Sequence, residues 1–162
     1  MQPIAWNPDW QHPPAFAGML ADSMVTDKVT VPCGAAPQPF GTVVASVPAS
    51  GVSALPIGAN SVEGIAIHEH GTGSRMNAAQ QGAYVQYDAM SVLRRGRIWA
   101  KASGACTKDA VAKYDPATGQ LADAGTGTLA NAKFLTTALT VPDILGGGSQ
   151  MIVQVELHSP AV

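Results

Sequence analysis

Hydrophobic and polar residues alternate along much of this chain in short segments. In the segment 97–103, Ile98, Ala100 and Ala102 occupy every second position, and polar or amphipathic residues stand between them. Successive side chains of a β-strand point to opposite faces, so this segment predicts a strand with one buried face. The same pattern predicts strands over 26–32, 41–47, 63–70, 132–139 and 150–158. Short strands separated by Gly and Pro indicate an all-β fold, a small β-barrel or a jelly-roll-like sandwich.

The turn signals support this assignment. Residues 115–119 read Asp-Pro-Ala-Thr-Gly between two strand-like stretches. Pro116 suits the second position of a type I turn, and Gly119 suits the left-handed position that closes a bulged hairpin. The only helix candidate, 76–81, is one or two turns long, and the glycines of 146–149 predict a loop before the last strand.

Residues 1–18 differ from the single β-rich domain expected over 19–162. Four prolines within the first 14 residues exclude a helix and favour an extended arm. Trp6 and Trp10 lie on this arm, whereas a solvated tail normally lacks such bulky apolar groups. Two interpretations remain open: the arm packs on its own domain, or residues 1–15 anchor the protein to a neighbouring subunit or another partner.

Composition favours a protein with partners. The chain has 162 residues, of which only 12% are charged, against about 25% in average proteins. Mean hydropathy is +0.12, yet no apolar run is long enough to cross a membrane. A monomer coated in small polar residues is one interpretation. The other is a subunit that hides part of its surface against copies of itself or against a larger partner.

Charge and cysteine content narrow the function further. A formal net charge of −2 argues against a nucleic-acid binder, which needs a basic face. Arg94, Arg95 and Arg97 cluster on and beside one predicted strand, and such clusters are solvated faces, subunit salt bridges or contacts to an acidic partner. Cys33 and Cys106 are too few for a disulfide framework and lack metal spacing, so both are expected to be buried or free thiols. The N-terminus lacks a signal-peptide pattern, which favours synthesis and assembly in a cytoplasm.

Candidate chemistry is sparse. His68 and His70 are two apart on a predicted strand and therefore share a face, as in the metal sites of cupin barrels. The carboxylate that cupins place four or five residues later is missing, because Ser74 and Arg75 stand there. Glycine-rich stretches near 71 and 125 lack the lysine of a phosphate-binding loop, and no nucleophile elbow or spaced carboxylate pair occurs. We therefore expect no catalytic residue, no cofactor and no metal.

The motifs, taken in order, resemble the structural cement or capsid decoration proteins of tailed bacteriophages. The matching pieces lie within 16–158 and are 16–23 (FAGMLADS), 39–44 (PFGTVV), 63–67 (EGIAI), 87–93 (YDAMSVL), 96–101 (GRIWAK), 109–111 (DAV), 133–135 (KFL) and 153–157 (VQVEL). The extension over 1–15 departs from this pattern.

The resemblance implies a non-enzymatic β-rich virion protein, often trimeric, that sits on the outer capsid surface and clamps neighbouring capsomers against internal pressure. Its partners would be the major capsid protein and itself, without nucleic acid or membrane. The residues that we expect to anchor it to the capsid or to a subunit are Trp6, Trp10, Phe16, Arg94, Arg95 and Arg97. The alternatives are a carbohydrate-binding or adhesion module, which needs exposed aromatic platforms, and a cupin-like metal-binding barrel.

Overall fold

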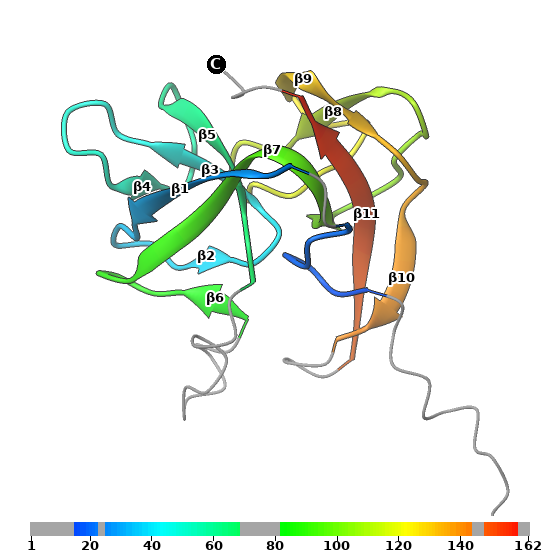
Figure 1. The fold of residues 1–162 in the computed structure, drawn as a ribbon, viewed down its shortest axis with the longest axis horizontal. Coiled ribbons are helices and arrows are strands. Elements are labelled where there is room, and N and C mark those ends of the chain that lie inside the picture. Colours follow the sequence, from blue (N-terminus) through cyan, green and yellow to red (C-terminus); the bar gives the residue numbers. More distant parts are fainter. Residues whose placement is uncertain (1–14, 23–24, 69–81, 144–147, 159–162) are drawn as a thin grey trace, which may run out of the picture.

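Antiparallel strands make up the described part of the chain, residues 15–22, 25–68, 82–143 and 148–158 of a computed structural model (Figure 1). No helix occurs within these ranges. The strands are β1 (Asp27–Pro32), β2 (Gln38–Pro39), β3 (Val43–Ser46), β4 (Ser53–Ala54), β5 (Ser61–Ala66), β6 (Ala83–Tyr84), β7 (Ala89–Ala102), β8 (Val111–Tyr114), β9 (Gly127–Phe134), β10 (Leu139–Pro142) and β11 (Ser149–Leu157).

One large sheet carries the fold. Its nine strands follow the order β4-β3-β5-β7-β11-β9-β8, with β1 also paired to β7 and β10 to β11, while β2 and β6 form a separate two-stranded sheet. The large sheet is strongly curled, so that strands from its two ends face each other across a common interior (Figure 1). The predicted all-β barrel or sandwich class is confirmed.

The long strand β7 links the two halves of the molecule. Its first half pairs with β1 and β5, and its second half, from Gly96 onward, pairs with β11. The predicted strand over 97–103 is this second half, and its apolar face is buried as expected. In the first half Val92 and Leu93 are both fully buried, because the two faces of β7 are covered there by different hydrophobic clusters. Burial on both faces removes the alternation by which a strand is recognised.

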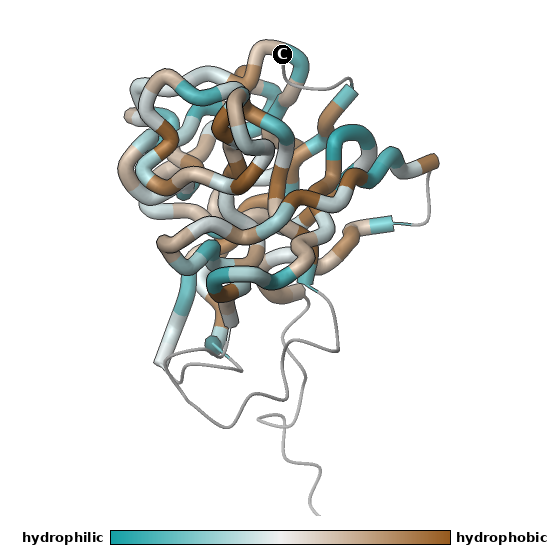
Figure 2. The backbone as a smooth tube through the Cα atoms, turned by 90° about the vertical axis from the view of Figure 1, so that its left-hand side faces the viewer, coloured by the Kyte–Doolittle hydropathy of each residue, from teal (hydrophilic) through white to brown (hydrophobic). Residues whose placement is uncertain are grey.

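Three apolar clusters surround this sheet. The largest fills the inside of the curl and includes Leu93, Ile98 and Phe134. A second lies between the first half of β7, β1 and the β2–β6 pair, around Met90 and Tyr84. A third consists of Ala15, Ala17, Val141 and Ile152, and it covers the outer side of β11. Hydrophobic and polar residues accordingly interleave along the described backbone (Figure 2).

The single strand predicted over 132–139 is wrong, because the chain turns a corner there. β9 ends at Phe134 and β10 begins at Leu139, and the two pair with different parts of the same edge of β11. At the corner the Leu135 N–H donates to the Gln154 carbonyl at 2.8 Å, and the Thr136 hydroxyl accepts the Gln154 N–H at 3.1 Å. The alternation of residue types continues through the corner, so pattern alone does not reveal it.

The strands predicted over 26–32, 41–47 and 150–158 agree with the structure within two residues at each end. The strand predicted over 63–70 begins earlier, at Ser61, and ends at Ala66. The predicted turn over 115–119 is confirmed: the Thr118 and Gly119 N–H groups donate to the Asp115 carbonyl, and Gly119 has φ +69°. The helix candidate 76–81 and residues 146–147 of the predicted loop lie outside the described residues, and β11 begins at Ser149.

Candidate functional site

Arg94 is held within the domain. Its guanidinium forms an ion pair with Glu63 of β5, and the Ser46 hydroxyl donates to the other carboxylate oxygen of Glu63 at 2.6 Å. The hydrogen bond from Ser46 and the charge of Arg94 lower the pKa of Glu63, although burial opposes them. This arrangement ties β3, β5 and β7 together, so the charge of Arg94 is already compensated inside the molecule.

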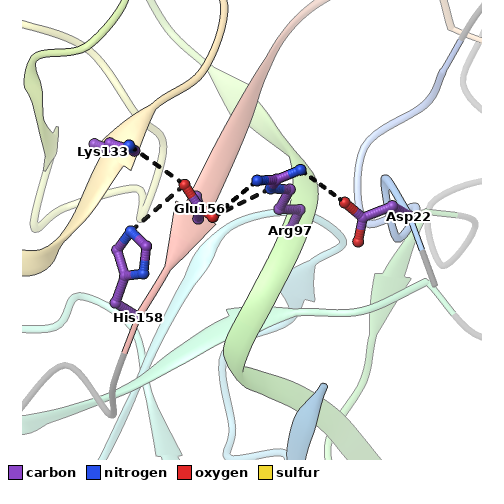
Figure 3. Close-up of polar contacts among 5 residues, drawn as sticks. All are labelled: Asp22, Arg97, Lys133, Glu156 and His158. Carbon is purple, nitrogen blue, oxygen red and sulfur yellow. Dashed lines mark hydrogen bonds and ion pairs between the residues drawn. The ribbon is translucent and has the colours of Figure 1, made fainter. Parts of the chain in front are cut away.

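Arg97 lies at the centre of a row of charges on the outer face of the sheet (Figure 3). Its guanidinium contacts Glu156 at 3.1 Å on one side and Asp22 at 3.2 Å on the other. Glu156 also lies 3.5 Å from the Lys133 ammonium and 3.4 Å from the His158 imidazole. Arg97, Glu156 and Lys133 stand directly opposite one another on β7, β11 and β9, so the strand register itself creates the row.

The row stabilises the charged forms of its members. Hydrogen bonding to Glu156 is the main cause that raises the pKa of Arg97. Burial works to raise the pKa of Glu156, but the hydrogen bond from Arg97 and the charges of Arg97, His158 and Lys133 together lower it. The row joins three neighbouring strands to the segment that carries Asp22, so the Arg97 head group serves an internal contact.

Arg95 differs from its two neighbours. It is exposed, and within the described residues it makes no ion pair. Of the three arginines that the sequence suggested as anchors, Arg95 is therefore the one whose charge remains available to a partner.

The described end of the predicted arm lies against its own domain. The Gly18 N–H donates to the Trp99 carbonyl at 2.7 Å, and the Trp99 N–H donates to the Met19 carbonyl at 2.9 Å. The Ala21 N–H donates to the Arg97 backbone carbonyl at 2.9 Å. Phe16 packs edge-on against His68, with ring centroids 5.0 Å apart. Residues 15–21 thus extend the sheet beside β7, while Trp6 and Trp10 lie outside the described residues.

His68 occupies an aromatic environment. The rings of Phe16 and Phe40 both make T-shaped contacts with its imidazole. Its backbone N–H donates to the Gly18 carbonyl at 2.9 Å. His70, the other histidine of the candidate metal pair, lies outside the described residues. Among the residues that are described, no three metal-ligating side chains gather at one point.

Most aromatic residues that a glycan platform would need are buried. Tyr84, Phe134, Phe40 and Tyr114 are all at least nine-tenths hidden, and Trp99 is half-buried. The exception is Tyr87, whose side chain is 87% exposed on the turn before β7. The amino-acid sequence alone does not distinguish Tyr87 from the other aromatic residues, because its exposure depends on the turn conformation.

Both cysteines are buried free thiols, as the sequence predicted. Burial, together with the negative charge of Asp123, raises the pKa of Cys106 to about 11, so this thiol stays protonated and unreactive near neutral pH. No helix in the described ranges is long and apolar enough to span a membrane.

A comparison with solved structures agrees with the all-β fold described above. A chain from the solved capsid of Myoviridae phage XM1 has the same fold, with a TM-score of 0.65, 15% sequence identity, and coverage of 96% of this chain and 98% of that chain. A search of curated proteins finds no match.

The family model described as structural cement protein (E217 gp24/Pam3 gp6) matches residues 9–158. The match starts before Phe16 and includes Trp10, whereas residues 1–8 and 159–162 lie outside it. The N-terminal departure placed at 1–15 is therefore corrected to residues 1–8. Because this match covers nearly the whole chain and the fold agrees with that of a phage capsid chain, the protein belongs to the family of phage structural cement proteins, with a structural role associated with the capsid.

Proposed function

We propose that this protein is a non-enzymatic cement that binds the outer surface of a phage capsid and stabilises it by clamping neighbouring capsomers. The match to the structural cement family over residues 9–158 is the observation that carries this proposal. Its partners would be the major capsid protein and further copies of itself. It would be made and assembled in the cytoplasm of the bacterial host, and a cryo-EM map of purified virions would locate it.

The connection between arm and domain suits a clamp that is held under tension. Residues 15–21 are joined to β7 by backbone hydrogen bonds, and Ala15 and Ala17 are buried against Val141 and Ile152. A pull on residues 1–14 would therefore be transmitted to β7, which pairs with strands of both halves of the sheet. If Trp6 and Trp10 hold a partner, the domain is built to resist the load that the partner applies.

Deleting residues 1–14 tests the anchoring role of the arm. Ala15 is kept because it is fully buried in the domain. We expect the truncated protein to retain its thermal unfolding temperature but to lose most of its occupancy on decoration-free expanded capsids after washing. Each anchoring Trp buries up to roughly 200 Å², and repetition over many sites multiplies its effect.

A double variant, Trp6→Ala with Trp10→Ala, serves as the matched control because it retains the length of the arm. Loss of occupancy in both variants assigns the anchoring to the two indole rings. Equal occupancy of the wild-type and truncated proteins would show that the arm is not an anchor.

A second prediction concerns assembly. The low charge content and positive mean hydropathy favour a homo-oligomer, and the resemblance to cement proteins, which are often trimers, makes a homotrimer the expected form. An obligate interface of this kind buries on the order of 2,000 Å² or more. Size exclusion coupled to light scattering at micromolar concentration is expected to give three times the chain mass. A monomer under these conditions would contradict the prediction.

A further inference from the structure

Tyr87 combines extreme exposure with an unfavourable backbone conformation. It is the most exposed large hydrophobic residue of the described chain, at 87%, and its φ is +73°. The Asp88 N–H donates to the Val85 carbonyl at 3.0 Å, so Tyr87 is the third residue of a four-residue turn. Because Gln86 before it has no positive φ, the turn is of type II, whose third position favours Gly or Asn. A bulky residue there is an outlier.

The turn is held firmly on both sides. The Val85 N–H donates to the Asp88 carboxylate at 2.7 Å. The Tyr87 N–H donates to the Cys33 carbonyl at 3.0 Å, and the Cys33 N–H donates to the Asp88 carbonyl at 2.7 Å. The backbone that carries the ring is thus ordered before any partner arrives, which reduces the ordering cost of binding.

Among the described residues next to Tyr87 in the turn, Asp88 carries a charge, and the exposed neighbours are uncharged. Gln86 precedes it, and Ala89 and Pro32, which face each other at the end of the β1–β7 pair, are exposed next to the turn. The carboxylate of Asp88 is occupied by the Val85 N–H. A phenol ring projecting from a patch of this kind complements an apolar hollow in a partner rather than a charged surface.

We propose that Tyr87 is a contact residue that inserts its ring into an apolar hollow of a capsid shell subunit. The proposal rests on the function proposed above and names one of its contact points. The fold gains little from this side chain, since it is exposed and its turn favours Gly or Asn. Because the fold does not require a tyrosine at this strained position, we infer that Tyr87 serves a contact with another molecule.

The area of this patch is too small to hold a second copy of this chain by itself, so the contact suits a shell to which the protein binds at many points. The tyrosine ring can bury up to about 200 Å², and its few small neighbours add little to this area. A stable dimer requires roughly 800 Å² on each partner. A small contact suffices only where many are made together, as on a shell that presents the same hollow many times.

The test uses the full chain, with two substitutions at Tyr87, on decoration-free expanded capsids. Tyr87→Asn removes the ring and suits the turn, so we expect an unchanged or raised unfolding temperature and an apparent affinity reduced about tenfold, as for an interface tyrosine. Tyr87→Phe keeps the ring and should bind within a few-fold of the wild type. Val25→Ala, at an 80% exposed site, is the control and should bind as the wild type does.

The outcomes separate the two proposals. If the wild type binds capsids and Tyr87→Asn binds equally well, the contact proposal is wrong and the cement function stands. If the wild type does not bind, the proposed function fails and the contact proposal fails with it. If Tyr87→Asn instead abolishes a signal on a glycan array while capsid binding is unchanged, Tyr87 belongs to a carbohydrate site and the proposal is overturned.

Discussion

Two turns of this molecule hold a residue at nearly the same left-handed angle, Gly119 at φ +69° and Tyr87 at φ +73°. Both turns are also closed by an aspartate, since Asp115 accepts the Ala117 N–H at 3.0 Å and Asp88 accepts the Val85 N–H at 2.7 Å. Gly119 is buried, and its carbonyl accepts the Val43 N–H at 2.7 Å. Tyr87 instead projects into solvent.

This comparison shows that two positions with nearly the same backbone angle can carry residues of different suitability for that angle. At position 119 both the backbone angle and the space require glycine, because a Cβ would lie 2.7 Å from the Val43 carbonyl oxygen. At position 87 the backbone angle favours Gly or Asn, but the chain carries a tyrosine. The first residue serves the fold, and the second costs the fold stability.

The largest effect is expected from Gly119→Val. The left-handed angle opposes a β-branched side chain, and the new Cβ would meet the Val43 backbone. Strain and overpacking together should lower the free energy of unfolding by roughly 2–5 kcal/mol. Chemical denaturation would measure the loss.

Gly51→Val is the matched control, because Gly51 also has φ +69° but a Cβ there would have nothing within 4 Å. It should cost only the conformational part, of about 1–2 kcal/mol. Equal losses at the two positions would show that packing against Val43 contributes nothing.

A smaller, pH-dependent effect is expected from Asp115→Ala. The Ala117 N–H and then the Thr118 hydroxyl hold the pKa of Asp115 below its usual value. A carboxyl whose pKa is lower in the folded state stabilises the fold above its unfolded pKa, and this contribution is lost as the pH falls through the folded pKa. The wild type should therefore unfold at a higher temperature than Asp115→Ala at pH 7, and the difference should shrink below about pH 4.

Asp115→Asn separates charge from hydrogen bonding, because its amide oxygen can still accept the Ala117 N–H. Its difference from the wild type should also decrease in acid. A difference between wild type and Asp115→Ala that stays constant from pH 7 to pH 3 would exclude the proposed role of the ionised carboxylate.

The smallest change in stability, an increase, is expected from Tyr87→Asn. Relief of the left-handed strain should raise stability by up to about 1 kcal/mol, which corresponds to a rise of roughly 2–4 °C in the unfolding temperature. Calorimetry would detect such a shift. A clear loss of stability would show that the Tyr87 ring supports the fold and would remove the contrast with Gly119.

The candidate anchors show how far the sequence could predict a site. Arg94, Arg95 and Arg97 form one cluster in the sequence, but they differ in the structure. Arg94 and Arg97 face carboxylates on neighbouring strands, Glu63 and Glu156, and only Arg95 is exposed without an ion pair among the described residues. Such partners come from strands far away in the chain, so the cluster alone could not reveal which charge is free.

The amino-acid sequence by itself determined the fold class, most strand positions and the turn at 115–119, because alternation and turn residues act over a few neighbouring positions. Tertiary structure alone decided where burial on both faces hides a strand, as at Val92 and Leu93, and where the chain turns a corner opposite Gln154. It also decided that Arg97 lies between Asp22 and Glu156 and that Tyr87 is exposed. These features depend on pairing between distant segments, which local sequence patterns do not encode.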